Sequence, residues 1–465
     1  MSVTFTIKAS EAQGRRLDPR FYHPVFRKNR VRIEACEHSE VKVLCGLSNE
    51  IWDKGQCFQD HFPYVEIGAI NCENGEIGNI EELATVDAPS RAQMVVRSGD
   101  LLVSATRPTR NAIAIVPTHV ENAIASTGFL VVRGVESSVV DPRYLFHALR
   151  MEFCTKQFDQ YSSGGNYPAI TKDDFRKMII PLPPLPEQRK IVAELDAAYA
   201  AKRAADEKAM KLLASIDDMV LNELGIAKLP KPDTSLSARM FTVPAREGLN
   251  GRLDSYSYSP FFADNLKRIR ARGSWRLGEL VALSHQQWDQ KTWQGNPDGD
   301  FPYIEIGAIS VVDGEIETIE SVPIADAPSR ARMMVASGDL LVSLTRPTRR
   351  AIAFATDSAI ASTGFAVIRG FSDEVLPEYL SVILRSELCT YQFDQRSTGG
   401  NYPAITEEQL LRCEIPTTSK AVQTRIVSKV SSIRAEARKL KADATAALES
   451  AKRGIEIRIV GGSDL

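Results

Sequence analysis

The feature that most constrains this chain is an internal repeat of domain size. The segment Phe62–Ile70 (FPYVEIGAI) returns almost unchanged as Phe301–Ile309 (FPYIEIGAI). When residues 62–116 are aligned with residues 301–355, about 36 of 55 positions are identical. The copies lie about 236 residues apart, which is the length of a complete domain and far longer than a solenoid unit. The 465-residue chain is therefore predicted to hold two copies of one module.

Each copy is predicted to consist of a strand-rich domain followed by a long helix. Short apolar runs such as residues 101–104 lie between Gly, Pro and Asn and indicate strands. The apolar spacing over residues 144–158 and 379–393 indicates helices. From Glu187 to Leu224 there is no interior Pro or Gly, which predicts one long helix. The fold class is therefore α+β, a tandem duplication of a strand-rich α/β domain with a long helix after each copy.

These patterns set the expected boundaries. We expect a first domain over residues 1–183 and a first helix over residues 184–226. A second domain is expected over residues 227–415, a second helix over residues 416–454 and a C-terminal tail over residues 455–465. The tail either lacks regular structure or packs on the first domain, and Arg458–Val460 is weak evidence for a strand in it.

Both long helices carry an apolar seam with alternating steps of three and four residues, which is one half of a coiled coil. Lys202 interrupts the first seam, and the second seam keeps its alternation. We expect the two seams to bury each other in an antiparallel intramolecular coiled coil, because like units tend to pack about a two-fold axis. Packing of each helix on its own domain and a parallel pair are the alternatives. The seam residues are Ile191, Leu195, Leu212, Ile216, Ile426, Val430, Ile433 and Leu440.

Charge and hydropathy exclude several classes of protein. The formal net charge of −2 rules out a generally basic nucleic-acid coat, so any contact with nucleic acid must come from local patches. No apolar run reaches the roughly 18 residues of a membrane-spanning helix, and the N-terminus has no signal-peptide pattern. We therefore expect a cytoplasmic protein whose seven cysteines are reduced.

Two strings carry a family resemblance. The junction Pro181–Val192 (PLPPLPEQRKIV) and the preceding Ser163–Thr171 (SGGNYPAIT) resemble the specificity (S) subunits of type I restriction–modification systems. The order of domain, helix, domain and helix is also similar to that HsdS-like family. The second junction departs from the pattern, since it keeps only Pro416 and Gln423, which leaves the start of the second helix uncertain.

The resemblance implies a non-catalytic reader of double-stranded DNA. Two methyltransferase (modification) subunits would bind along the helices and domains, and restriction (translocase–nuclease) subunits would join them where the system has them. Each domain would act as a target-recognition domain for one half of a split site. The resemblance implies no cofactor and no membrane. A DNA-binding or scaffolding subunit of another methyltransferase or phage-defence complex is the alternative.

Family members usually carry two unlike recognition domains, whereas the two copies here are alike. We therefore predict a nearly palindromic, interrupted DNA site. Three pairs of corresponding residues differ and are candidates for a base difference between the half-sites: Gln93 and Arg332, Ala105 and Leu344, and Asn111 and Arg350.

Three loop motifs, each present in both copies, carry side chains suited to DNA. The Thr-Arg-Pro-Thr-Arg loops supply arginines, which can bond two acceptors of guanine, and threonines, which can reach phosphate or base. A Ser-Arg pair and a Gly-Gly-Asn-Tyr-Pro string add a further arginine and an asparagine that can bond adenine twice. The candidates are Arg91, Thr106, Arg107, Thr109, Arg110, Asn166, Tyr167, Arg330, Thr345, Arg346, Thr348, Arg349, Asn401 and Tyr402.

Each of these motifs also has a structural interpretation. The arginines could be solvated or form ion pairs within the domain, and ordinary turn chemistry accounts for Gly-Gly-Asn-Tyr-Pro. The basic runs Arg27–Arg32 and Lys267–Arg272 could neutralise phosphates or simply form solvated helix faces.

The motifs of catalysis are missing from the sequence. It contains no phosphate-binding GxxxxGK[ST] loop, no HExxH, no zinc-ligand spacing and no adenine-methyltransferase string. None of the six histidines has a counterpart in the other copy. We therefore expect no catalytic and no metal-binding residues. A hidden nuclease built from Glu66 and Asp100 is the enzymatic alternative, although Asp100 has the pattern of a turn, and a protein scaffold without DNA contact is a third class.

Overall fold

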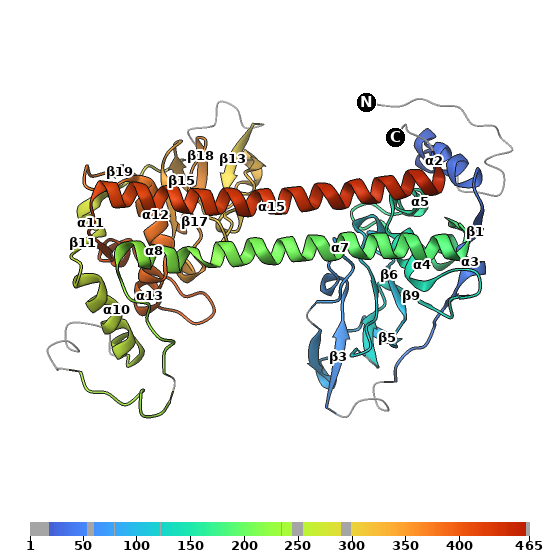
Figure 1. Cartoon of the computed structure of the whole chain (residues 1–465), viewed down its shortest axis with the longest axis horizontal. Helices are drawn as coiled ribbons and strands as arrows, with labels where there is room; N and C mark the ends of the chain where they lie inside the picture. Colours follow the sequence, from blue (N-terminus) through green and yellow to red (C-terminus); the bar gives the residue numbers. More distant parts are fainter. Residues whose placement is uncertain are drawn as a thin grey trace. The chain divides into compact units, whose positions relative to one another are not determined.

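The computed structural model describes residues 18–53, 60–78, 80–120, 122–233, 235–243, 254–289 and 299–461. The chain forms two compact units (Figure 1). The first unit contains residues 1–205 and 442–465, and the second contains residues 206–441. Each unit therefore combines one strand-rich copy with parts of both long helices. Cys57 lies outside the described residues, and the other six cysteines are free thiols.

The strands of the first unit form two four-stranded sheets and a two-stranded ribbon. One sheet has the order β4-β3-β8-β5, the other β2-β9-β6-β7, and β1 pairs with β10. Only β3 and β8 run parallel among the described pairs, with Tyr64 opposite Ile124. The strands are β1 (His38–Glu40), β2 (Gly46–Leu47), β3 (His61–Val65), β4 (Glu81–Ala84), β5 (Ala92–Val96), β6 (Leu101–Ser104), β7 (Ile113–Ile115), β8 (Ala123–Ser126), β9 (Phe129–Arg133) and β10 (Ile179–Pro181).

The second unit repeats this topology strand for strand. Its sheets have the orders β14-β13-β18-β15 and β12-β19-β16-β17, and β11 pairs with β20. Tyr303 lies opposite Ile360 in the parallel pair, as Tyr64 lies opposite Ile124. The strands are β11 (Ser274–Arg276), β12 (Val281–Leu283), β13 (Asp300–Ile304), β14 (Glu320–Pro323), β15 (Ala331–Val335), β16 (Leu340–Ser343), β17 (Ile352–Phe354), β18 (Ala359–Ser362), β19 (Phe365–Phe371) and β20 (Glu414–Pro416).

Short helices cover the sheets in both copies. The first unit has η1 (Pro19–Tyr22), α2 (Pro24–Glu34), α3 (Val41–Leu44), η2 (Ile67–Ala69), η3 (Thr85–Asp87), η4 (Pro108–Arg110), α4 (Pro142–Leu149), α5 (Glu152–Tyr161) and α6 (Lys172–Arg176). The second has η5 (Tyr256–Tyr258), α10 (Pro260–Arg270), α11 (Leu277–Leu280), η7 (Ile306–Ala308), η8 (Ile324–Asp326), η9 (Pro347–Arg349), α12 (Pro377–Arg385), α13 (Glu387–Arg396) and α14 (Glu407–Leu411).

The helices expected over 144–158 and 379–393 are each two helices. Met151 and Ser386 adopt extended backbone (ψ 161° and 164°), so α4 ends before α5 begins and α12 ends before α13 begins. The apolar spacing does not indicate the break between the two helices, because both helices of a pair bury residues in the same core. In that core the hydroxyl of Tyr144 donates to the carbonyl of Pro181 at 2.7 Å, and Tyr379 does the same to Pro416 at 3.2 Å.

The first long helix runs to Leu224 as predicted, and its two parts, α7 (Leu185–Ala214) and α8 (Ile216–Leu224), are separated only by Ser215, which keeps right-handed helical backbone. The interruption falls at Ser215, whose hydroxyl donates to the carbonyl of Leu212 at 2.7 Å. Back-bonding of this kind competes with the helical ladder. Gly225, at φ 63°, ends α8 as the sequence predicts.

The second long helix is α15 (Lys420–Val460), and its predicted limits were wrong at both ends. It starts after a Thr-Thr-Ser segment, and Ser419 accepts the backbone N–H groups of Val422 and Gln423. Residues 455–460 are helical, so the suggested strand at Arg458–Val460 is wrong. Of the two alternatives for the tail, packing on the first domain is confirmed for these residues. The reason is burial, because Ile455 and Val460 belong to the hydrophobic core of the first unit.

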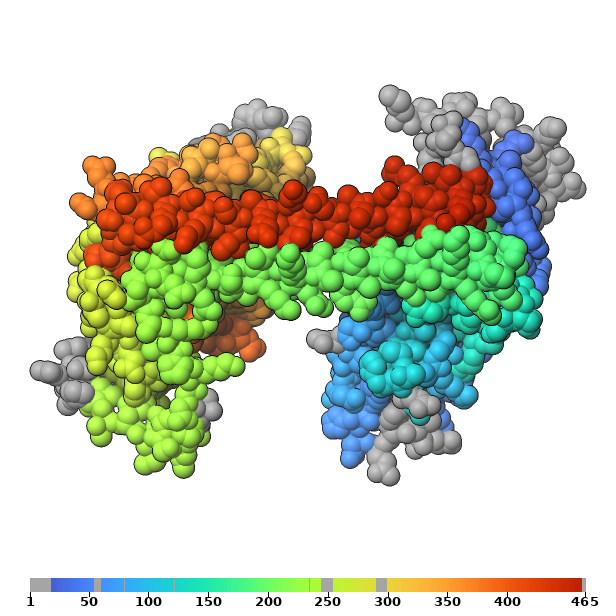
Figure 2. Space-filling view, in the orientation of Figure 1, coloured from blue at the N-terminus to red at the C-terminus, as the bar shows by residue number. Residues whose placement is uncertain are grey.

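The two long helices pair antiparallel within each unit. In the first unit Arg458 bonds Glu187 (3.2 Å) and Glu194 (3.0 Å), and the Lys452 ammonium lies 5.6 Å from the Tyr199 ring centroid. Residues later in α7 thus contact residues earlier in α15. The two helices therefore run antiparallel in the first unit, as predicted, and a parallel pair is excluded there. In the second unit Glu223 of α8 bonds Arg425 and Lys429 of α15, each at 2.5 Å. In Figure 2, α15 is red and α7 and α8 are green.

The eight predicted seam residues differ in their burial. Ile191, Leu195, Ile426 and Val430 are at most 2 % exposed, and they also extend the domain cores. The remaining four, Leu212, Ile216, Ile433 and Leu440, are half-buried. Ile191 and Leu195 thus pack on the first domain, and Ile426 and Val430 pack on the second, which is the alternative packing of each helix on its own domain near its start.

A buried glutamine attaches each long helix to its domain. Gln188 donates to the carbonyls of Pro183 (2.8 Å) and Val139 (3.1 Å) and accepts from the N–H of Asp141 (2.8 Å). Gln423, at the divergent second junction, makes the same three kinds of bond with Thr418, Glu374 and Leu376. Both side chains are fully buried. The glutamine thus makes the hydrogen bonds that join the helix to the domain. This explains why the second junction keeps the glutamine although it lacks most of the prolines of the first.

Candidate nucleic-acid interface

The Thr-Arg-Pro-Thr-Arg loops adopt a strained and duplicated backbone conformation. Arg107 and Arg346 have left-handed φ angles of 48° and 49°, directly before the buried prolines that begin η4 and η9. For a residue other than glycine this conformation costs about 1–2 kcal/mol. Strain held in both copies at the same arginine marks a functional position more often than a structural one.

The structure brings this loop together with the Gly-Gly-Asn-Tyr-Pro loop. The backbone N–H of Arg107 donates to the carbonyl of Pro168 at 2.6 Å, and its Nη2 donates to the carbonyl of Asn166 at 2.9 Å. Its guanidinium lies 4.3 Å from the ring centroid of Tyr167, in cation–π geometry. We call Arg107, Asn166 and Tyr167 the arginine–tyrosine cluster of the first unit.

The second unit contains the same cluster, formed by Arg346, Asn401 and Tyr402. The Arg346 N–H donates to Pro403 at 2.6 Å, its Nη2 donates to the carbonyl of Asn401 at 2.9 Å, and its guanidinium lies 4.3 Å from the Tyr402 ring. The identical geometry shows that repeated sequence has produced a repeated site.

Each cluster faces solvent. Tyr167 and Tyr402 are each 69 % exposed, which is unusual for a ring that already stacks on an arginine. The Nε–Nη2 edge of Arg107 is held by Asn166, and within the described residues no hydrogen bond of its Nη1 is recorded. The arginine is therefore fixed by one edge while the other edge stays available to a ligand.

A third motif shares this edge of the domain. The carbonyl of Arg91 accepts from the N–H of Thr127, and the next residue, Gly128, accepts from the N–H of Ala105. Corresponding bonds link Arg330 to Thr363 and Leu344 to Gly364. The exposed residues Arg91, Arg110, Arg330 and Arg349 therefore flank the clusters from adjoining loops.

The threonines have different surroundings. Thr106 and Thr345 are half-buried, and their carbonyls accept from the hydroxyls of Ser104 and Ser343 at 2.7 Å, so their backbone helps to shape the loop. Thr109 is exposed, whereas Thr348 is half-buried. Of the two threonines in the first copy of this loop, only Thr109 thus has a solvent-exposed side chain.

Two predicted sets of residues point away from this interface. The basic runs hold helices in place: Arg32 donates to the carbonyl of Gly461, and Arg270 and Arg272 bond Glu414 and the carbonyl of Gly225. Asn111 and Arg350 face α5 and α13, where Asn111 donates to the carbonyl of Arg150 and Arg350 donates to Thr390. The phosphate-binding role of the basic runs and the base-selecting role of the Asn111–Arg350 difference therefore find no support in the geometry.

One acid of the enzymatic alternative, Asp100, is held in an ion pair within the fold. Both carboxylate oxygens of Asp100 accept from Arg133, at 2.8 and 2.6 Å, and the pair raises the pKa of that guanidinium. Asp339 and Arg369 repeat the pair in the second unit at 2.7 Å. Among the described residues there is no group of three or more His, Cys, Asp or Glu side chains that could hold a metal ion. No helix in this part of the chain is long and apolar enough to cross a membrane.

The sequence did not reveal that Arg107 stacks on Tyr167, some 60 residues further along the chain. The available signal was that both motifs recur together in both copies. A pair of loops that is retained as a pair is a candidate for direct contact.

Part of the chain is similar to a family of known proteins. Residues 46–209 match the family described as "Type I restriction modification DNA specificity domain". The HindI specificity subunit of a type I restriction enzyme from Haemophilus influenzae is 29 % identical over 119 residues. That match spans 25 % of this chain and 25 % of the relative.

Solved structures were also compared. A chain from a study of complex assembly in the type I restriction–modification system is 26 % identical, with coverage of 91 % of this chain and 96 % of that one and a TM-score of 0.49. The HsdS subunit from Thermoanaerobacter tengcongensis is 25 % identical with the same coverage and a TM-score of 0.38. The S subunit from M. genitalium is 11 % identical, with coverage of 92 % and 96 % and a TM-score of 0.39.

Residues 46–209, which include much of the candidate interface, thus match the model of a type I restriction–modification DNA specificity domain. This match and the similarity to the HindI specificity subunit confirm the resemblance that the sequence indicates.

Proposed function

We propose that this chain is the sequence-specific DNA-recognition subunit of a type I restriction–modification complex. The observation that carries the proposal is the duplicated arginine–tyrosine cluster, which lies exposed on the same strained turn in both copies. A duplex site with two related half-sites is the natural target of two like readers.

The chemistry of the cluster suits base readout in the major groove. The open edge of the Arg107 guanidinium can donate to O6 and N7 of guanine, and the exposed Asn166 amide can pair with adenine. The flanking Arg91, Thr109 and Arg110 can bond phosphates, which fixes the register without reading sequence. Because Arg107 is held by Asn166 and Tyr167 before DNA arrives, little side-chain entropy remains to be lost on binding.

The proposed complex has several members. The two strand-rich copies act as target-recognition domains, and α7, α8 and α15 act as the spacer helices. Two methyltransferase subunits bind along the helices and domains, and restriction subunits join where the system has them. The chain itself performs no catalysis and requires no cofactor.

The test uses the assembled complex and removes one arginine at a time. In Arg107→Ala or Arg346→Ala, affinity for the recognised site is expected to fall by about 1–3 kcal/mol, the value of one good bidentate base contact, while non-specific binding changes little. The measurement is DNA binding by fluorescence anisotropy at several salt concentrations. Arg412→Ala is the matched control, because Arg412 is exposed and paired with Glu408 on its own helix.

Three outcomes would contradict the proposal. Equal loss on specific and random DNA would reject base readout at the cluster. Salt-independent behaviour of the wild-type complex would favour a scaffold without DNA contact. Cleavage of plasmid DNA by the purified chain with a divalent metal would favour the nuclease alternative.

A further inference from the structure

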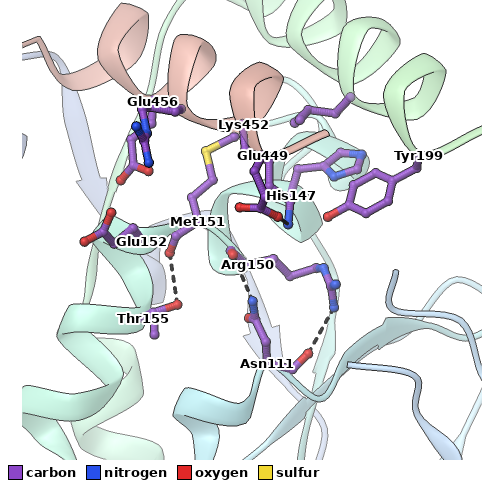
Figure 3. Close-up of a pocket in the computed structure, with 12 residues that line it drawn as sticks. Asn111, His147, Arg150, Met151, Glu152, Thr155, Tyr199, Glu449, Lys452 and Glu456 are labelled. Atoms are coloured by element: carbon purple, nitrogen blue, oxygen red, sulfur yellow. Dashed lines mark hydrogen bonds and ion pairs between the residues drawn. The ribbon is translucent and has the colours of Figure 1, made fainter. Parts of the chain in front are cut away.

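The first unit contains a pocket that is distinct from the DNA-facing loops. It encloses about 320 Å³ between α4, α5, α7 and the C-terminal part of α15 (Figure 3). Asn111, Arg150, Thr155, Tyr199 and Glu456 are among its lining residues. Figure 3 shows Asn111 and Arg150 side by side at one wall and Glu456 on the opposite helix.

The second copy places an arginine at the corresponding position. Arg350 aligns with Asn111 and has the same left-handed backbone, with φ 63° against 65°. Its Nε donates to Oγ1 of Thr390 at 3.0 Å, and its Nη1 donates to Oδ2 of Asp217 at 2.7 Å. The second unit therefore holds a guanidinium between a threonine and a carboxylate at this place in the fold.

The first unit keeps the surroundings of that guanidinium but lacks the arginine. Thr155 corresponds to Thr390, and each hydroxyl donates to the backbone carbonyl four residues earlier. Glu456 accepts the Phe153 N–H at 2.9 Å near the start of α5, as Asp217 accepts the Glu387 N–H at 3.0 Å at the start of α13. Asparagine at position 111 is too short to reach across, and its buried Oδ1 has no hydrogen-bond partner among the described residues.

The surroundings of the Glu456 carboxylate show the consequence of the missing arginine. Burial is the largest influence on Glu456 and raises its pKa, although Arg32 and Lys156 act in the opposite direction. A carboxylate that loses solvent without a direct cationic partner gains strongly from a bound cation.

Arg150, Lys452 and Arg453 also line the pocket, and the first two have partners of their own. Arg150 donates to four backbone carbonyls, those of Cys72, Glu73, Asn111 and Ile113, at 2.8–3.1 Å. Its counterpart Arg385 likewise donates to backbone carbonyls, including that of Arg350. Burial is the main cause that lowers the pKa of Arg385 to about 9. Lys452 is paired with Glu449 at 2.8 Å. The fold therefore accommodates a second guanidinium next to this buried arginine.

We propose that the pocket between Asn111, Thr155 and Glu456 binds a small alkylguanidinium cation, in the place that Arg350 fills in the second unit. The ligand would donate to the Thr155 hydroxyl, the free Asn111 carbonyl oxygen and the Glu456 carboxylate. The inference is independent of DNA recognition, because none of these side chains belongs to the arginine–tyrosine cluster.

The test measures binding of methylguanidinium to the full chain by saturation-transfer NMR, with tetramethylammonium and phosphate as control ions at equal ionic strength. The wild-type chain should bind methylguanidinium at one site. Asn111→Arg should abolish binding by filling the pocket with its own side chain. Glu456→Gln should weaken binding about tenfold, as expected for loss of one charged hydrogen bond.

The second copy offers the matched variant. Arg350→Asn should open the corresponding space and create a second methylguanidinium site in a chain that otherwise keeps the first. Binding that is unchanged in both Asn111→Arg and Glu456→Gln would overturn the proposal. Equal saturation transfer to tetramethylammonium, or preferential binding of phosphate beside the unpaired Arg150 Nε, would also overturn it.

Discussion

At the scale of single residues, the candidate interface depends on a few backbone conformations that most amino acids avoid. Arg107 and Arg346 are left-handed, and so are the glycines of the loops that hold them, Gly164 at φ 114° and Gly399 at φ 104°. Glycine is required at the latter positions, since a Cβ on Gly164 would lie 3.1 Å from the carbonyl oxygen of Tyr167. Neighbouring Gly165 has open space around it and an ordinary φ.

Gly164→Ala is therefore expected to destabilise the loop by about 1–2 kcal/mol and to displace Tyr167 from the Arg107 guanidinium. Specific DNA binding by the assembled complex should fall, as measured by fluorescence anisotropy. Gly165→Ala is the matched control and should bind as the wild type does. Equal effects of the two substitutions would show that the loop conformation is unimportant.

A second residue-scale prediction concerns His147, which is 3 % exposed and bonded to Asp196 at 2.9 Å. Burial lowers the pKa of His147 to about 4, despite the opposing effect of Asp196. Since the folded pKa lies below the unfolded value, neutral His147 contributes fully above pH 6.5, and that contribution is lost as the pH falls from about 6.5 to about 4. The loss amounts to up to about 3 kcal/mol.

Chemical denaturation at several pH values measures this effect. His147→Val copies the second unit, where Val382 occupies the corresponding position, and should flatten the dependence of stability between pH 6.5 and pH 4. An unchanged slope in the variant would show that another group causes the acid loss.

At the scale of elements, the sequence predicted the two helices and their antiparallel pairing but misplaced several ends. Periodicity marks which face is buried, and this face continues through the breaks at Met151, Ser215 and Ser386. The C-terminal limit failed for a similar reason, because Gly454 resembles a helix end while Ile455 and Val460 are buried in the first unit. The loops of the site were predictable as motifs, whereas the stacking of Arg107 on Tyr167 depends on tertiary contacts that no local pattern encodes.

The buried glutamines are the strongest element-scale prediction. Removing Gln423 leaves the N–H of Leu376 and the carbonyls of Thr418 and Glu374 without their partner, so Gln423→Ala should lower the free energy of unfolding by about 2–3 kcal/mol. Thr424→Ala, at an exposed neighbour, should change it by less than about 0.5 kcal/mol. Denaturant unfolding measures both. Equal small effects would mean that the junction is held by other contacts.

At the scale of the whole molecule, the duplication predicts the symmetry of the target. Both units present the same arginine, asparagine and tyrosine in the same geometry, so their half-sites should be nearly identical and inverted. Mapping methylated adenines in a host that carries the complete system measures this. Two unrelated half-sites would show that residues outside the clusters dominate base choice.

The discontinuity of the first unit has a consequence for synthesis. Its core includes Ile455 and Val460, and Glu456 beside them bonds Phe153, which lies 303 residues earlier in the chain. Phe153 and its neighbours therefore gain their final covering only after this later segment has been synthesised, and a product that stops before residue 455 exposes apolar surface in its first unit. Proteases and chaperones can thus distinguish copies that stop before residue 455 from copies that continue past it.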